Sequence, residues 1–431
     1  MVCSGKCVDP ETDVKNCGAC GVTCPVLCSS GECAVVTATS VGFGSACAVV
    51  SDGTVECWGD NHGGALGDSS STGPDTCPDG ACSPTPVRVT GLAGAMSVSL
   101  GVSSGCALLS GGTVDCWGAN VCGQLGSGSF TGPDDCGGFA CSPTPMPVVG
   151  LSGVTTMSFG GQGGCAPISG GAVECWGLNT SGELGIGDAS GPEMCAAGDT
   201  CSTTPVVVPA LAGVTTVAMG VVSACALLPD GTVECWGSNI FGQLGSGTAT
   251  GPELCGGEPC STTPVPVAGL AGVTALSVGW YSACAALSDG TVECWGASLG
   301  SAGPQTCSGL ACSPTPVPVA GLSGVVSVSV GMGSACAVLS DGTVDCWGEN
   351  EFGQLGNGGT VSSSLPLPVA GLAGVSCVSV GPHYTACAVL SGGALKCWGD
   401  NEFGQLGNGT VTGPDSCGGV RCSTTPVSVV W

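Results

Sequence analysis

The segment CAVVSDGTVECWG (residues 47–59) places two cysteines ten positions apart around a Ser-Asp-Gly turn and ends on a tryptophan and a glycine. Alternating side chains on both sides of such a turn predict a β-hairpin. A three-residue loop with Gly53 in the left-handed conformation sets Cys47 and Cys57 directly opposite each other. If the residues flanking the loop form the closing hydrogen-bonded pair, the cysteines form a non-hydrogen-bonded pair with Cα atoms about 4.5 Å apart, which a disulfide can bridge.

The same hairpin recurs along the chain. The tripeptide Cys-Trp-Gly occurs seven times, 51 to 60 residues apart, beginning at Cys57, Cys116, Cys175, Cys235, Cys294, Cys346 and Cys397. Each unit also carries an alternating segment before the hairpin, then a glycine-rich connection and a short Pro-bounded segment after it, which predict about four short strands. The period predicts an all-β, seven-bladed propeller of four-stranded blades over residues 34–431. Recurrence in every unit favours a structural crosslink over a reactive site.

The two ends of the array predict how the ring closes. The first unit begins at Val35 with no Pro-bounded strand before it, whereas the last unit ends with such a strand at residues 425–430. We therefore expect the C-terminal strand to complete the first blade, which would leave no open edge for aggregation.

Composition excludes several classes of protein. Five Lys and Arg against 31 Asp and Glu give a formal charge of −26, which repels nucleic acid and anionic membranes. The apolar runs are too short to span a bilayer. Thirty-five cysteines predict disulfides and an extracellular, cell-surface or periplasmic location. Because the start, MVCSGKCVDP, lacks a signal-peptide pattern, we expect either a removed signal or a longer precursor.

The repeat text resembles the regulator of chromosome condensation (RCC1) family. The family's Gly-Gln-Leu-Gly box stands at residues 123–126, 242–245, 353–356 and 404–407, with weaker copies at 64–67 and 182–185. The resemblance implies a seven-bladed propeller used as a protein-binding platform. One branch of the family acts on a small nuclear GTPase, and secreted bacterial members inhibit β-lactamases. We carry over the fold of a secreted, cysteine-rich bacterial type and not the nuclear exchange activity, which the acidic surface and the disulfides disfavour.

The chain departs from the family pattern in two ways. Unit five has ASLGSAGPQ in place of the Gly-Gln-Leu-Gly box. The histidine that usually stands two places before the first hairpin cysteine is replaced by Ser45, Ser104, Gly163, Ser223, Ser282, Ser334 and Thr385.

The cysteine spacing predicts two sets of local disulfides. The hairpin set comprises Cys47–Cys57, Cys106–Cys116, Cys165–Cys175, Cys225–Cys235, Cys284–Cys294, Cys336–Cys346 and Cys387–Cys397. The second set lies in loops that open with Gly-Pro and comprises Cys77–Cys82, Cys136–Cys141, Cys195–Cys201, Cys255–Cys260, Cys307–Cys312 and Cys417–Cys422. Half of a zinc site is the alternative for these loop pairs. Each crosslink is expected to add somewhat under about 3 kcal/mol to the free energy of unfolding, and together they predict resistance to heat and proteolysis.

Two cysteines, Cys122 and Cys377, have no partner in this pattern. We expect Cys377 to be a buried strand residue and Cys122 a loop thiol or part of a loop crosslink. A nucleophilic cysteine would need a neighbouring base. The two histidines, His62 and His383, lie in the first and last units, which become neighbours when the ring closes, and surface or turn positions are the simpler interpretation.

Residues 1–33 predict a separate small module held by disulfides, because so short a segment has no core of its own. It contains Cys3, Cys7, Cys17, Cys20, Cys24, Cys28 and Cys33. The run resembles the stigma-specific-protein-like cysteine-rich module of secreted bacterial surface proteins. A metal held by Cys17, Cys20 and Cys24 is the alternative. Because the number is odd, one cysteine must be free, pair elsewhere or have a partner upstream.

The function predicted from these features is a non-enzymatic binding or structural scaffold, monomeric and without a cofactor. Its loops differ between units while the strand text repeats, which is typical of a fixed frame that presents variable contacts to a protein or glycan. An inhibitor of a secreted enzyme such as a β-lactamase is a narrower alternative. A calcium-stabilised protein is another, prompted by loop acids such as Asp134 and Asp135, although no EF-hand spacing is present.

A carbohydrate-active enzyme is the remaining alternative. It would use paired carboxylates around the central channel. Candidates are Glu56, Asp115, Glu174, Glu234, Glu293 and Asp345, with Lys396 at the same position of the last unit. One acid at the same place in each repeat is more simply a solvated strand position, and the sequence shows no place where unlike residues converge.

Overall fold

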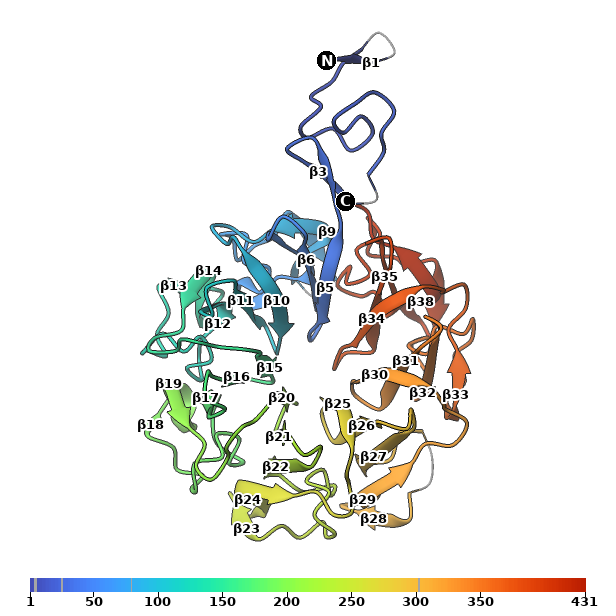
Figure 1. Ribbon diagram of the computed structural model, residues 1–431. Helices are drawn as coiled ribbons and strands as arrows, with labels where there is room; N and C mark the ends of the chain where they lie inside the picture. The colour runs from blue at the N-terminus through green and yellow to red at the C-terminus, as the bar shows by residue number, and fades with distance from the viewer. Residues whose placement is uncertain (4–5, 25, 79, 301–302) are drawn as a thin grey trace.

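The computed structural model describes residues 1–3, 6–24, 26–78, 80–300 and 303–431, the side chains of Lys6, Cys7 and Ala197 excepted. Within this part of the chain, seven antiparallel sheets surround a central channel (Figure 1). The prediction of an all-β, seven-bladed propeller is confirmed. No helix in the described residues has the length and apolar run needed to cross a membrane.

Each blade begins at the channel and runs outward. The innermost strands are β5 (Val36–Val41), β10 (Ala95–Leu100), β15 (Ser158–Gly160), β20 (Thr216–Met219), β25 (Val273–Val278), β30 (Val325–Val330) and β34 (Val375–Val380). The second strands are β6 (Ser45–Val50), β11 (Ser104–Leu109), β16 (Gly163–Pro167), β21 (Ser223–Leu227), β26 (Ser282–Leu287), β31 (Ser334–Leu339) and β35 (Thr385–Leu390). The third strands are β7 (Val55–Asp60), β12 (Val114–Ala119), β17 (Val173–Leu178), β22 (Val233–Ser238), β27 (Val292–Ala297), β32 (Val344–Gly348) and β36 (Leu395–Asp400).

The outer strands differ from the expectation. The fourth strands are β9 (Gly80–Arg88), β14 (Ala140–Pro147), β19 (Thr200–Val207), β24 (Glu258–Pro266), β29 (Leu310–Pro318), β33 (Ser363–Pro368) and β38 (Val420–Ser428). Six blades of the described chain add a fifth edge strand: β8 (Asp75–Cys77), β13 (Asp134–Asp135), β18 (Glu193–Met194), β23 (Glu253–Cys255), β28 (Gln305–Cys307) and β37 (Asp415–Cys417). The expectation of four strands per blade was therefore wrong for these blades. The extra strand is one arm of the Gly-Pro loop, which folds back on the fourth strand next to its own cysteine pair.

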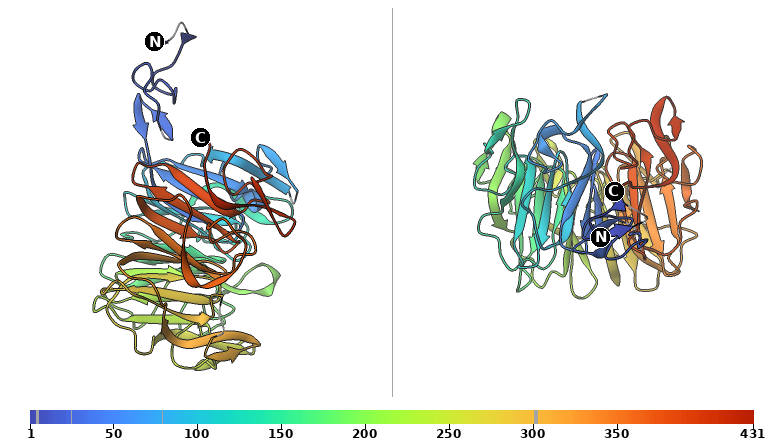
Figure 2. Two further views of the ribbon diagram at one scale, coloured as in Figure 1. Left: turned by 90° about the vertical axis from the view of Figure 1, so that its right-hand side faces the viewer. Right: turned by 90° about the horizontal axis from the view of Figure 1, so that it is seen from above.

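The remaining elements are short. The 3-10 turns are η1 (His62–Gly64) and η2 (Ala196–Gly198), and the N-terminal hairpins are β1 (Val2–Cys3) with β2 (Lys6–Cys7) and β3 (Leu27–Ser29) with β4 (Glu32–Ala34). The N-terminal segment extends outward from the ring, between the first and seventh blades (Figures 1 and 2). It holds the disulfides Cys3–Cys20, Cys17–Cys28 and Cys24–Cys33, and the expected crosslink of Cys7 lies outside the described side chains.

The hairpin of the first blade has the geometry that its sequence indicates. Cys47 lies opposite Cys57 in the register of β6 and β7, with their Cα atoms 4.0 Å apart. Gly53 has a φ of 80°, and the amide of Val50 donates to the carbonyl of Thr54 over 2.9 Å. The structure joins each of the other six hairpin pairs and each of the six loop pairs named above by a disulfide.

Tryptophan and glycine together form the contact between blades. Trp176 of the third blade is fully buried against the second blade, and its indole N–H donates to the carbonyl of Gln124 over 3.0 Å. The box glycine that follows, Gly126, has a φ of 64°, and a Cβ atom there would lie 3.1 Å from the Trp176 ring. Only glycine gives both this conformation and this approach. The box and the tryptophan of the next unit therefore form one interlocking contact.

Ring closure uses this contact in place of strand exchange. The C-terminal strand β38 pairs with β36 in the seventh blade, so the prediction that it completes the first blade was wrong. The glycine-rich connection is long enough for the Pro-bounded segment to return and pair within its own unit. The first and seventh blades then meet through Trp58, whose N–H donates to the carbonyl of Gln405 over 2.9 Å and whose ring contacts Trp431.

A belt of serines on the innermost strands adds a second link between blades. In each case the serine hydroxyl accepts an amide N–H from the innermost strand of the next blade; the serines are Ser40, Ser99, Ser158, Ser277, Ser329 and Ser379. The last of them closes the ring, because Ser379 accepts from Val41 over 3.0 Å. In the fourth blade the position is Ala218, which cannot make this bond.

Candidate functional site

The loops between the first and second strands surround one end of the channel, which itself encloses a cavity of about 230 Å³. We call these loops the mouth; they comprise residues 42–44, 101–103, 161–162, 220–222, 279–281, 331–333 and 381–384. Their side chains differ between blades although the strands repeat, and they include Phe43, Val102, Gln162, Trp280 and His383. The mouth is therefore a place where unlike residues meet.

Aromatic rings from distant units converge at the mouth. The ring of Phe43 lies 4.6 Å from that of His383 and 6.3 Å from that of Trp280, measured between centroids. These residues belong to the first, seventh and fifth blades, and each is partly accessible to solvent. The sequence alone did not indicate this cluster of rings, because only ring closure brings these units together.

The glycine-rich connections supply further rings. In two units the residue before the box is a phenylalanine that packs on a mouth tyrosine of the next blade: Phe241 lies 4.7 Å from Tyr281, and Phe352 stacks on Tyr384 at 4.4 Å. The box glutamine fixes this position, since Gln243 Oε1 accepts the amide N–H of Phe241 over 2.8 Å. We call the resulting cluster the aromatic arc; it comprises Phe43, Phe241, Trp280, Tyr281, Phe352, His383, Tyr384 and Phe403.

A buried carboxylate lies next to the histidine of the arc. The Nδ1 atom of His383 lies 3.0 Å from Oδ2 of Asp400. Asp400 is 1% exposed, and the same oxygen accepts a hydrogen bond from Gln405 Nε2 over 2.8 Å. The loop of unit seven is one residue longer than the others, which brings this histidine to the mouth. His62 is exposed and contacts Phe139 at the edge of the ring. Burial raises the pKa of nearby Asp60, and the charges of both histidines oppose that rise.

The variable cysteine loops lie at the same end of the blades as the mouth. The amide of Asp60, at the end of β7, donates to the carbonyl of mouth residue Gly44, and the next amide, that of Asn61, donates to Ala81 in the cysteine loop. Exposed apolar residues stand in or beside these loops, among them Phe139, Leu254 and Leu310. The Ser-Asp-Gly turns form the opposite face.

The repeated carboxylates do not form a common site. Glu56 lies on β7 between Ala48 and Arg88, and its carboxylate pairs with the Arg88 guanidinium at 3.1 Å. Asp115, Glu174, Glu234, Glu293, Asp345 and Lys396 hold the same register in the other blades, one residue in each. Burial raises the pKa of Glu56, Asp115, Glu174 and Asp345. The residues that line the channel come instead from the innermost strands and the mouth.

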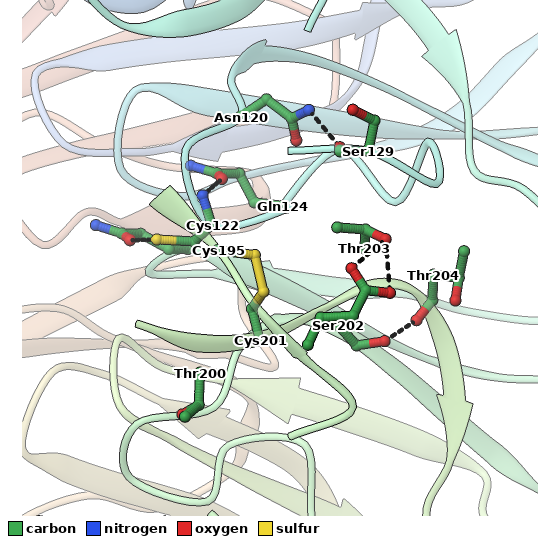
Figure 3. The surroundings of a disulfide bond; sticks show 12 residues. Asn120, Cys122, Gln124, Ser129, Cys195, Thr200, Cys201, Ser202, Thr203 and Thr204 are labelled. Atoms are coloured by element: carbon green, nitrogen blue, oxygen red, sulfur yellow. Dashed lines mark hydrogen bonds between the residues drawn. A yellow bond between two sulfur atoms is a disulfide. The ribbon is translucent and has the colours of Figure 1, made fainter. Parts of the chain in front are cut away.

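Cys122 takes the place that phenylalanine holds before the box in other units. The side chain is 2% exposed, and its thiol donates to Gln162 Oε1 over 2.7 Å. Burial raises its pKa to about 12, with smaller effects of the carboxylates of Asp199 and Glu183. Figure 3 shows this thiol with the nearby Cys195–Cys201 disulfide. A thiol that stays protonated is a poor nucleophile.

The other cysteine groups also lack reactive character. Cys377 lies half-buried on β34, and burial raises its pKa. In the N-terminal module the sulfur atoms of Cys17, Cys24 and Cys33 lie within 4.8 Å of one another. All three are in disulfides, as is Cys20, so they offer no thiolate to a metal.

Comparison with known proteins supports an RCC1-like propeller. Models of the regulator of chromosome condensation (RCC1) repeat match residues 341–388 and, in a second version, residues 97–124, 325–354 and 375–405. The chain is 30% identical over 336 residues to the human E3 ubiquitin-protein ligase HERC2, a match that covers 74% of this chain and only 6% of the ligase. It is 27% identical over 387 residues to the ultraviolet-B receptor UVR8 of Arabidopsis thaliana, covering 86% and 78% of the two chains.

Solved structures show the same fold. Yeast RCC1 (Prp20), in a crystal structure with Kap60, aligns with a TM-score of 0.68 at 20% identity and covers 88% of this chain and 84% of that one. The similar proteins are known by name as a ligase, a receptor and a protein bound to another protein.

Proposed function

We propose that the chain is an exported, non-enzymatic scaffold that binds a protein partner with its mouth face. The observation that carries this proposal is the aromatic arc: partly exposed rings from separate blades meet at one end of a rigid frame. Aromatic side chains are enriched at the centres of protein interfaces because they bury a large area with little loss of conformational freedom. The disulfides support export, since a reducing compartment would not maintain them.

The surroundings of the arc favour a protein over a small molecule. The cysteine loops beside the mouth carry exposed apolar side chains that differ between blades, as expected for the outer contacts of an interface. A secreted enzyme is one such partner, and inhibition of that enzyme is then a consequence of binding. Carbohydrate cleavage is not proposed, because the structure places the candidate carboxylates in separate blades.

A photo-crosslinking experiment tests the proposal. Benzoyl-phenylalanine is introduced in place of Val221, at the mouth, or in place of Asp230, on the opposite face of the same blade. The mouth variant is expected to crosslink one extracellular protein, which is then produced pure and titrated against the native chain and Trp280→Ala. Equal labelling from both faces, or an unchanged affinity of Trp280→Ala, would refute the proposal.

A further inference from the structure

The missing box of unit five leaves a pocket between the fifth and sixth blades. In the first blade, Phe403 of the preceding unit covers Gly44, where an added Cβ atom would lie 3.1 Å from the Phe403 ring. In the seventh blade, Phe352 covers Tyr384 in the same way. Unit five has neither box nor phenylalanine, and a pocket of about 460 Å³ lies at the corresponding place.

The pocket walls combine aromatic, thioether and acidic groups. Tyr281 forms one side, Met332 and Leu310 contribute apolar surface, and Glu349 lies at the pocket over Gly333. Phe241 supports the Tyr281 ring from behind at 4.7 Å between centroids.

The Glu349 carboxylate does not make the hydrogen bond to the box glutamine that its counterpart makes in the seventh blade. In the seventh blade the equivalent acid, Asp400, accepts a hydrogen bond from the box amide of Gln405. In the sixth blade the box amide Nε2 of Gln354 is buried without a partner in the described structure, so Glu349 does not take this role. The carboxylate is therefore free to meet a ligand.

The acids at the pocket have no salt-bridge partner among the described residues. Partial desolvation raises the pKa of Glu349, and the nearby Glu351 carboxylate raises it further. Both acids also raise the pKa of Tyr384, where burial is the larger cause. Among the described residues, the salt bridges are Arg88 with Glu56 and His383 with Asp400, and neither involves this pocket.

We propose that this pocket receives a basic side chain, arginine or lysine, of the protein that binds the mouth face. A guanidinium or ammonium group would contact the face of Tyr281 and pair with the Glu349 carboxylate, while its aliphatic stem packs on Met332 and Leu310. Arginine fits better, because its planar group can stack and pair at once. The inference rests on the proposed function, since it names the anchor of that interface.

Peptide titrations of the full chain test this inference without knowledge of the partner. The probes are acetyl-Gly-Arg-Gly-amide and the same peptide with citrulline, a neutral isostere of arginine. Binding is followed by the methyl NMR signal of Met332 in protein labelled at methionine methyl groups. The arginine peptide is expected to shift this signal, with affinity about tenfold weaker for Glu349→Gln and unchanged for Asp341→Asn, which removes one charge from the opposite face of the same blade.

Several outcomes would overturn the inference. These are no shift with the arginine peptide, equal binding of the citrulline peptide, or an equal loss in both variants, which would indicate a general charge effect. Stronger shifts with calcium or with a neutral oligosaccharide would assign the pocket to those ligands. If the crosslinked partner binds the mouth and Glu349→Gln leaves its affinity unchanged, the anchor is wrong and the proposed function stands.

Discussion

Glu183 offers the sharpest test of the physical reasoning. It stands where other units have the box glutamine and is fully buried: its Oε2 accepts the amide N–H of Ser181 over 2.7 Å, and Oε1 has no partner among the described residues. Burial raises its pKa from 4.5 to about 7. Glutamine has the same shape and does not ionise, so Glu183→Gln isolates the effect of the charge.

The sign and size of the effect follow from the pKa difference. Between about pH 4.5 and 7 the folded chain holds a proton that the unfolded chain releases, so the stability contribution of Glu183 is complete below this window and is lost as pH rises through it. The pKa difference of about 2.5 between the folded and unfolded chain corresponds to at most about 3 kcal/mol in the free energy of unfolding. Glu183→Gln is therefore expected to raise the free energy of unfolding by up to about 3 kcal/mol at pH 8 and to change it little at pH 4.

Guanidinium unfolding, followed by tryptophan fluorescence with disulfides intact, measures this difference at several pH values. The reciprocal variant Gln124→Glu, in which a carboxyl replaces the amide that accepts from the backbone of Cys122, is expected to become less stable as pH rises. Equal stabilisation by Glu183→Gln at pH 4 and pH 8 would show that packing, and not the charge, is responsible. No stabilisation at pH 8 would show that the carboxylate is solvated there.

Three further predictions concern the frame. Ala218→Ser is expected to add the missing hydrogen bond of the serine belt and to raise the free energy of unfolding by about 0.5–1 kcal/mol, measured in the same assay; a loss would mean that the fourth blade is spaced differently. Gly126→Ala is expected to lower the free energy of unfolding by about 2 kcal/mol or more, because the added Cβ atom strains the backbone and meets the next tryptophan. Gly137→Ala, whose Cβ atom would meet nothing within 4 Å, is expected to lower it by only about 1 kcal/mol. Brief treatment with a thiol reductant and an alkylating agent should label the exposed Cys20 and Cys33 before the buried hairpin cysteines, as mass spectrometry would show; uniform labelling would contradict the burial described above.

The blades were predictable because their determinants are local. The turn conformation of Gly53 and the pairing of Cys47 with Cys57 follow from spacing within a single repeat, and the number of blades follows from the number of copies of that repeat. The closure was not predictable in the same way. In a circular array, any four consecutive strands of the repeat could form one blade. The periodicity of the sequence does not say which four strands the chain uses. The return of the fourth strand, for example Ser83 opposite Gly59, depends on the path of the glycine-rich connection.

The fifth strands and the mouth were missed for different reasons. An edge strand of two or three residues, such as Asp134–Asp135, is too short to show alternation. The mouth residues Phe43 and His383 are 340 positions apart and meet only in the closed ring. A signal was present, since the residues after the glycine that follows the first-strand segment vary between units while the strands on either side repeat. Variation within a constant frame marks a surface free of packing constraints.

Irregular units by themselves do not mark a site. Glu183 replaces a glutamine, yet its side chain is buried between blades. Ala218 lacks the serine hydroxyl, and it adds only a methyl group to the wall of the channel cavity. The interface of the fifth and sixth blades is different. There unit five has no box to pack against the next blade, and among the described residues Glu349 has no salt-bridge partner. Lost frame contacts, an open pocket and an unpaired charge coincide at one place on the accessible face, which is the combination expected where a frame gives up stability for binding.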